Sequence, residues 1–199
     1  MRRITLLAVL IGTLVSAGCN DQKAAEAPPA PMELVSSAIG HYCGMSVLEH
    51  TGPKGQIILA SRKEPIWFSS ARDTLSFTML PEEPKDIRAI YVSDMARAPS
   101  WDEPGAKNWI DARTAFFVLG SRMKGGMGAD EAVPFSDRGS AETFSKVNGG
   151  RVAAFAEIPK DYVLGAGAET TNAIEGARGA TDTHHGPAAA KASKSDHTH

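Results

Sequence analysis

The middle of this chain repeats itself, and the repeat restricts the possible folds more than any other feature of the sequence. The segment 57–62 (Ile-Ile-Leu-Ala-Ser-Arg) recurs in residue type as the segment 117–122 (Phe-Val-Leu-Gly-Ser-Arg). Phe-Ser follows each copy, at residues 68–69 and 135–136, and a second phenylalanine comes nine residues after the first. Two matched halves are the simplest explanation of such a pattern.

Each half is predicted to run strand, turn, strand, helix, strand. Residues 57–60 and 116–119 are apolar runs of strand length. A strand with a basic first residue is expected to close each half, starting at Arg88 and at Arg151. The predicted fold class is therefore α+β, with two similar ββαβ units packed together.

The limits of the two helices are predicted from capping residues. Ser69 and Ser136 each place a hydroxyl before a helical pattern, as an N-cap requires. Pro81 and Pro84 are expected to end the first helix, and Asn148-Gly149-Gly150 the second. The predicted divisions are a signal peptide (1–18), a lipidated cysteine and flexible tether (19–36), the first unit (37–98), a linker with Trp101 pinned against one unit (99–114), the second unit (115–164) and a disordered tail (165–199).

The N-terminus carries a targeting signal. Arg2 and Arg3 precede an apolar segment, residues 4–15, and Ser16-Ala17-Gly18-Cys19 follows it. This pattern is typical of a secretory signal and too short to span a membrane comfortably. Cys19 stands where a bacterial lipoprotein is acylated, which would anchor the protein stably. Ser16 departs from that signal, which usually has leucine there.

Composition narrows the function. The formal charge of −2, with acidic and basic residues mixed, gives no sign of a nucleic-acid footprint, and no stretch resembles a basic groove with interleaved aromatics. The chain has two cysteines. If Cys19 carries lipid, Cys43 has no disulfide partner in an oxidising compartment, and burial, a metal or a reactive role must account for it. The alternative is a Cys19–Cys43 disulfide in a protein that is merely secreted.

Cys43-Gly44-Met45 is the first candidate for chemistry. A thiolate and a thioether are soft ligands that suit monovalent copper. In an extended segment, residues two apart share one face, so both sulfurs could reach one ion, and His41 would share that face as well. The alternative is that Cys43 and Met45 pack in a core, where both residue types are common.

The second half has a longer hairpin than the first. Seven positions separate Ser61 from Phe68, whereas 14 separate Ser121 from Phe135. The extra piece contains Met127 between glycines, in a loop expected to be exposed and mobile. Met127 is either an ordinary surface residue or a movable thioether that closes over an ion held by Cys43 and Met45.

The predicted tail carries His184, His185, His197 and His199. Imidazoles in a mobile tail can bind divalent metal weakly. A solvated tail without a selected role explains them equally well.

The chain resembles the family of the nitrous oxide reductase accessory lipoprotein NosL. The lipoprotein-type signal, Cys43-Gly44-Met45, the glycine-flanked Met127, both Phe-Ser segments and Gly149-Gly150 carry the resemblance, which spans most of residues 39–159. Many relatives have a second cysteine or a proline where this chain has His41-Tyr42, so thiol pairing is absent there.

The resemblance implies a fold of two ββαβ units and a periplasm-facing, membrane-anchored copper(I) chaperone without enzymatic activity. It implies Cys43 as thiolate ligand and Met45 and Met127 as thioether ligands. His41 is the preferred candidate for a further donor, since His50 is expected at the surface. The implied partners are nitrous oxide reductase, its membrane maturation complex or both, with the chaperone a monomer or a copper-bridged dimer.

Two other function classes are compatible with these residues. In a thiol-dependent redox or hydrolytic lipoprotein, Cys43 would be the nucleophile and His41 or His50 the base, with an orienting acid and an oxyanion hole besides. In a structural or partner-binding lipoprotein, the sulfur atoms would simply be buried.

Overall fold

The computed structural model describes residues 27–165. The signal peptide, Cys19, the first part of the tether and the tail histidines His184, His185, His197 and His199 lie outside the described residues. Within them the α+β fold class is confirmed, with two antiparallel sheets and few helices. No helix of residues 27–165 is long and apolar enough to cross a membrane.

The first unit has the predicted ββαβ order and gains one strand. Its elements are β1 (Gly55–Leu59), β2 (Ile66–Phe68), α1 (Ala71–Met79) and β3 (Ile87–Ser93). A further strand, β4 (Trp109–Asp111), comes from the segment predicted as a linker and pairs with β3. The sheet order is therefore β2-β1-β3-β4.

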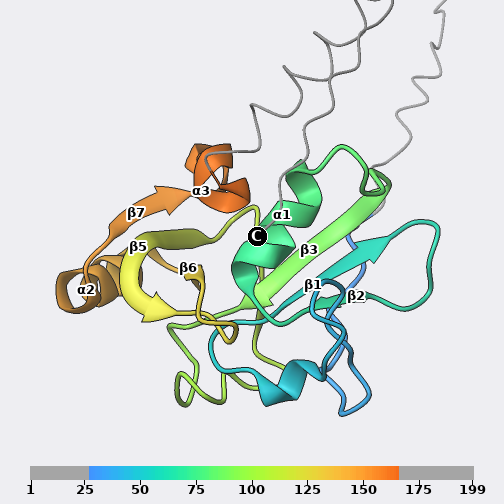
Figure 1. Ribbon diagram of the computed structural model, residues 1–199, viewed down its shortest axis with the longest axis horizontal. Coiled ribbons are helices and arrows are strands. Elements are labelled where there is room, and N and C mark those ends of the chain that lie inside the picture. Colours follow the sequence, from blue (N-terminus) through green and yellow to red (C-terminus); the bar gives the residue numbers. More distant parts are fainter. Residues whose placement is uncertain (1–26, 166–199) are drawn as a thin grey trace, which may run out of the picture.

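The second unit repeats the ββαβ order without an added strand. It comprises β5 (Phe116–Lys124), β6 (Asp130–Phe135), α2 (Arg138–Asn148) and β7 (Arg151–Ala154), in the sheet order β6-β5-β7. A short 3-10 turn, η2 (Phe155–Glu157), and helix α3 (Lys160–Leu164) follow. Figure 1 shows the two sheets side by side, with α2 at the outer end of the second.

The predicted helix caps are each wrong by one residue. Ser70 caps α1, because its hydroxyl accepts a hydrogen bond from the Asp73 amide at 3.2 Å. Asp137 caps α2 in the same way, through the Ser140 amide at 2.8 Å. The shift leaves the Ser69 hydroxyl free for another contact.

One apolar core joins the two units. Phe68 and Phe77 of the first unit belong to the same buried cluster as Phe117 and Ala132 of the second. A second apolar cluster lies on the other face of the first sheet. Successive side chains of β1 point to opposite faces, so Ile57 packs in the shared core and Ile58 in this second cluster. A third cluster lies between α2 and the second sheet, where Trp101 stacks on Phe144 at 6.4 Å as expected for a pinned linker.

The segment before the first sheet covers the face to which Ile58 points. Leu34, Ala38 and Val47 are buried there. The predicted tether is bonded to the sheet from Pro29 onward: the Tyr91 hydroxyl donates to the Pro29 carbonyl at 2.7 Å, and Met32 exchanges two hydrogen bonds with Gln56. The first sheet therefore fixes the position of the chain that leads to Cys43.

Candidate metal centre

Cys43 lies in a closed turn, not in the extended segment that the sequence analysis assumed. An isolated bridge joins Ile39 to Ser46, and the Gly40 amide donates to the Met45 carbonyl at 2.9 Å. Gly44 donates back to Gly40 and has a φ of 66°, a left-handed value that glycine adopts without strain. The geometry that would have put His41 and Met45 on the face of Cys43 is therefore absent from this turn.

The thiol of Cys43 faces two polar side chains from outside the turn. Its Sγ lies 3.7 Å from Nε2 of His50 and 3.6 Å from Oγ of Ser69. Cys43 is a free cysteine and is half-buried. The Phe68-Ser69 motif thus ends β2 with a hydroxyl beside the thiol, while its neighbour Ser70 caps α1.

His50 is buried, and the expectation that it lies at the surface is wrong. It follows the 3-10 turn η1 (Val47–Glu49), and only 7% of its surface is exposed. This turn reverses the chain between Cys43 and His50. It thereby places the His50 imidazole, seven residues later in the sequence, beside the Cys43 thiol. The ammonium of Lys54 donates to the His50 carbonyl and, at 3.1 Å, to that of Thr51, so the backbone of His50 is held as well.

The Met127 loop packs against His50. A Cβ on Gly126 would overlap the Cβ of His50 and lie 3.1 Å from its Cα. Glycine at this position therefore permits a close approach of two segments far apart in the sequence. Met127 follows directly and is 57% exposed. The loop that carries the second predicted methionine thus meets the segment that carries the cysteine.

His41 points to a different partner. Its Nε2 lies 3.2 Å from Oε1 of Glu83, an oxygen that also accepts from the Tyr42 hydroxyl at 3.0 Å. The imidazole packs edge-on against Phe68 and Phe77. Burial and the Glu83 carboxylate together raise the pKa of Tyr42, so its hydroxyl remains a donor. The histidine beside the thiol is therefore His50.

The donor types in this region restrict the metal that it suits. Residues 27–165 contain no group of three or more His, Cys, Asp or Glu side chains able to hold a metal ion. A site at Cys43 must therefore complete its ligand set with other donors, and the thioethers of Met45 and Met127 are both accessible, with 40% and 57% of their surface exposed. Thiolate, imidazole and thioether form a set for a soft monovalent ion, not for magnesium or calcium.

Two buried ionisable groups, Lys54 and Glu131, lie close to the candidate site. Burial lowers the pKa of Lys54 to about 8, and the negative charges of Glu131 and Cys43 oppose this effect. Burial raises the pKa of Glu131 to about 7, against hydrogen bonds from the amides of Arg72 and Ala132. Within the described chain, Oε2 of Glu131 has no hydrogen-bond partner, and it faces Gly125 at the base of the Met127 loop.

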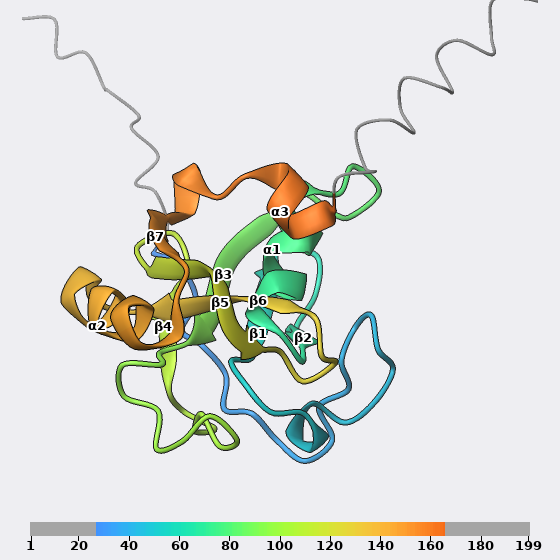
Figure 2. The same ribbon diagram turned by 60° about the vertical axis from the view of Figure 1, so that its left-hand side comes forward.

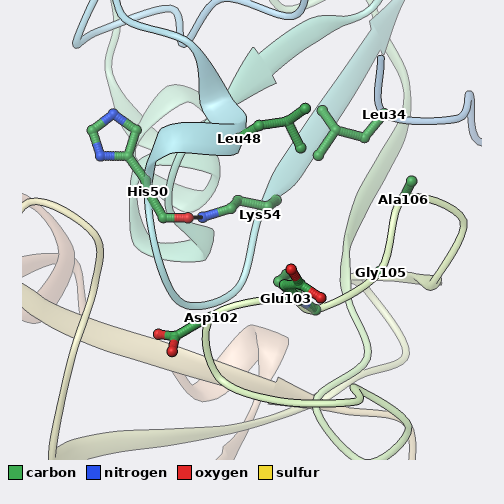
Figure 3. Close-up of a pocket in the computed structure, with 9 residues that line it drawn as sticks. Leu34, Leu48, His50, Lys54, Asp102, Glu103, Gly105 and Ala106 are labelled. Carbon is green, nitrogen blue, oxygen red and sulfur yellow. Dashed lines mark hydrogen bonds between the residues drawn. The ribbon is translucent and has the colours of Figure 1, made fainter. Parts of the chain in front are cut away.

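A pocket of about 370 Å³ opens on the other side of His50, and we call it the lateral pocket. Figure 3 shows Leu34 and Leu48 on one wall, with their side chains directed toward each other, and Asp102 and Glu103 on the loop opposite. Lys54 lies between these walls, and His50 lines the pocket at one side, with its ring directed away from the two leucines (Figure 3). The pocket is lined by Leu34, Leu48, His50, Lys54, Asp102, Glu103, Pro104, Gly105 and Ala106.

Sequence reasoning misplaced two neighbours of the thiol. Ser69 is predicted as a helix cap, and His50 is named as a possible base and donor but is expected at the surface. The sequence does contain a signal for Ser69. Ser70 follows it directly, and when one of two consecutive serines caps a helix, the hydroxyl of the other is available for another contact. No comparable signal marked His50, whose burial depends on the turn η1 and on a loop 76 residues further along the chain.

Three comparisons with known proteins agree. A model of the protein family described as NosL matches residues 31–163. The chain is similar to the copper-binding lipoprotein NosL of Achromobacter cycloclastes, with 47% identity over 135 residues, 67% of this chain and 70% of that protein. It is 34% identical over 154 residues to the protein of the same name from Stutzerimonas stutzeri, covering 77% of this chain and 78% of the relative. The crystal structure of the copper chaperone NosL from Shewanella denitrificans matches with a TM-score of 0.62 and 36% identity, covering 67% of this chain and 98% of that one.

Proposed function

Because this chain belongs to the NosL family, we propose that it is a copper(I) chaperone that holds the ion at Cys43, His50, Met45 and Met127. The copper ion is its cargo. The ligand set differs from the one expected from the sequence in a single residue: His50 replaces His41, since His41 is engaged by Glu83.

The separation of Cys43 Sγ and His50 Nε2 is the observation that carries this proposal. Metal–sulfur and metal–nitrogen bonds are about 2.3 and 2.0 Å for the comparable ion zinc. Bonds of these lengths to two atoms 3.7 Å apart enclose an angle of about 120° at the metal. That is a trigonal angle, and it leaves room for a third ligand in the same plane.

The thioethers supply this third ligand and explain how a carrier can release its ion. Met127 is 57% exposed on a loop already in contact with His50, and Met45 is two residues from Cys43. A thioether is a soft but weak ligand, so a thiolate or imidazole of an acceptor protein can replace it. Copper then passes by ligand exchange and is never free in solution.

The acceptor and the location follow from the same family assignment. We infer that the copper serves the copper-sulfide cluster of nitrous oxide reductase, through that enzyme, its membrane maturation complex or both. We also infer a lipid anchor at Cys19 and a periplasm-facing position. The support is the lipoprotein-type signal at residues 1–19 and the lipoprotein names of two relatives.

Competition titration against a copper(I) chelator tests the ligand set. Cys43→Ala is expected to lose most of the affinity, and His50→Ala a large part, because each removes a direct donor. His41→Ala is the matched control: it removes the same ring two residues from Cys43 and should bind copper about as tightly as wild type. If Cys43→Ala binds like wild type, or if His41→Ala is the weaker of the two histidine variants, the ligand set is wrong.

The pair of thiol and imidazole also supports a second candidate, a thiol-dependent enzyme with Cys43 as nucleophile and His50 as base. Alkylation by iodoacetamide separates the two functions. A copper carrier is protected from alkylation by stoichiometric copper(I) and turns over no substrate. Fast alkylation that copper does not slow would favour the enzyme, and an unreactive thiol that binds no copper would favour a structural protein.

A further inference from the structure

Most exposed apolar side chains of residues 27–165 lie on the segment that carries Cys43 or at Met127. Eight large hydrophobic residues are exposed in the described part of the chain, and seven of them lie either on the segment 32–48 or at Met127. The exception is Val147 on α2. The seven are Met32, Val35, Ile39, Tyr42, Met45, Leu48 and Met127. Exposed apolar surface gathered in this way is typical of a protein interaction site.

The lateral pocket gives this surface a specific shape. One wall is apolar, formed by Leu34 and by Leu48, which is 53% exposed, and the facing loop carries the carboxylates of Asp102 and Glu103 (Figure 3). A lysine or arginine side chain has the matching character, because its methylene stem packs on apolar surface while its charged end reaches an acidic one.

The charges of the pocket are not neutralised internally. Among residues 27–165, no hydrogen bond or ion pair involves the carboxylate of Asp102 or Glu103, and the segment 27–53 contains no lysine or arginine. Two cations lie nearby. Lys107 pairs with Glu33 at 3.2 Å. Lys54 donates to the carbonyls of His50 and Thr51 and keeps its positive charge, so two carboxylates against this one ammonium leave the pocket lining with a net charge of −1.

On these grounds, and building on the proposed copper-chaperone function, we propose that the lateral pocket receives a lysine or arginine side chain of the protein that accepts copper from this chain. Charge complementarity selects this occupant. A two-fold pairing of copies with the loop of Asp102 and Glu103 at the axis is disfavoured, because like charges would then face each other.

The position of the pocket explains why docking there would serve transfer. His50 lines the pocket and also lies 3.7 Å from the Cys43 thiol. A protein seated in the pocket is therefore one side chain away from the copper, with Met45 and Met127 exposed nearby for exchange. The acidic loop would also guide a basic partner at long range, an effect that salt weakens.

Nuclear magnetic resonance titration of the full chain with two tripeptides tests the pocket. Acetyl-Leu-Arg-Leu amide is expected to bind saturably, to shift the amides of Leu48, His50 and Ala106, and to bind less tightly as salt rises. Acetyl-Leu-Gln-Leu amide, which keeps the apolar groups without the charge, is expected to bind several-fold more weakly. The double variant Asp102→Asn/Glu103→Gln is expected to weaken binding of the arginine peptide about two- to thirtyfold, the range of two exposed charge pairs.

Glu64→Gln/Glu142→Gln removes the same number of exposed charges elsewhere, and its peptide affinity should equal that of wild type. Equal binding of both peptides, or undiminished binding by the Asp102/Glu103 variant, would overturn the proposal. So would self-association of the chain that Leu48→Glu abolishes, or shifts of the same amides by phosphatidylglycerol micelles, since a second copy or a lipid would then be the occupant.

Copper binding is measured separately on the same variants. Asp102→Asn/Glu103→Gln should bind copper(I) as tightly as wild type, because neither side chain is a proposed ligand. A wild-type chain that binds no copper would refute the chaperone function and the identity of the partner with it. If copper binds but the arginine and glutamine peptides bind equally well, only the docking inference is refuted.

Discussion

Lys54, which no sequence motif marks, holds the backbone of the candidate site in place. It is one of the largest fully buried side chains in the described chain, with 2% of its surface exposed. Its pKa of about 8 keeps the ammonium charged at neutral pH. The two carbonyls that it binds belong to His50 and Thr51, so it fixes the backbone of the proposed imidazole ligand from a position four residues later.

Lys54→Met is therefore expected to weaken copper binding without removing a ligand. The carbonyls of His50 and Thr51 would lose a buried donor, which costs about 1–3 kcal/mol of folding free energy. Urea denaturation and chelator competition measure the two effects. Lys63→Met, at an exposed position before β2, is the control and should change neither. Wild-type copper affinity in Lys54→Met would show that the His50 backbone needs no such support.

Glu131 predicts a pH dependence of stability. In the unfolded chain the pKa of its carboxyl is 4.5, whereas in the folded protein burial raises this pKa to about 7. Between these values the folded state binds more protons, so stability is highest below pH 4.5 and falls as pH rises to 7. The difference in pKa corresponds to at most about 3 kcal/mol.

Urea denaturation of wild type and Glu131→Gln from pH 5 to pH 8 measures this contribution. A glutamine has no such titration, so the stability of the variant relative to wild type should improve as pH rises through this window. Glu142→Gln, on the exposed face of α2, should instead run parallel to wild type. Parallel profiles for Glu131→Gln and wild type would show that the buried carboxyl does not titrate in this range.

At the scale of elements, the hairpin of β5 and β6 brings the second half of the chain to the first. Its strands pair regularly from Phe116 to Leu119 and then shift register before Lys124 pairs with Asp130. Beyond this irregularity, the loop at the end of the hairpin packs against His50 through Gly126. The corresponding hairpin of the first unit, between β1 and β2, has no such extension, so only one of the two repeats carries a methionine loop.

Gly126→Ala is expected to move this loop off the site. Its added methyl group would overlap His50, while the position itself has an ordinary backbone conformation that alanine tolerates. Copper affinity should therefore fall in the same direction as in Met127→Ala, and the thermal unfolding midpoint should change little. In the double variant the two losses should be less than additive, because both act through the same thioether. If the two losses of copper affinity were strictly additive, Gly126→Ala would act by some route other than the Met127 thioether.

At the scale of the whole molecule, the two units share their stability. The central core contains residues of both sheets, and α1 of the first unit contacts β6 of the second. Asp94, fully buried at the end of β3, accepts from the Ser136 amide at 3.0 Å and from Nε of Arg97 at 2.7 Å. Figure 2 shows α3 lying above α1 of the first unit and the strands of the second.

Calorimetry should therefore find a single cooperative unfolding transition for residues of both units. Asp94→Ala is expected to lower its midpoint, because the loss of hydrogen bonds to a buried carboxylate costs about 2–4 kcal/mol. Asp161→Ala, in the exposed first turn of α3, serves as the control and should lower it less. Two separate transitions would instead mean that the repeats are independent domains.

Local sequence determined the repeated ββαβ order, because strand length, capping residues and the Asn148-Gly149-Gly150 stop act within a few positions of one another. It also singled out Cys43, Met45 and Met127 by residue type and spacing. Only the tertiary structure recruited β4 into the first sheet and brought His50 to the thiol in place of His41. The physical reason is distance along the chain: the burial of His50 depends on Lys54, η1 and the Met127 loop together, and no periodicity near His50 records a contact made 76 residues away.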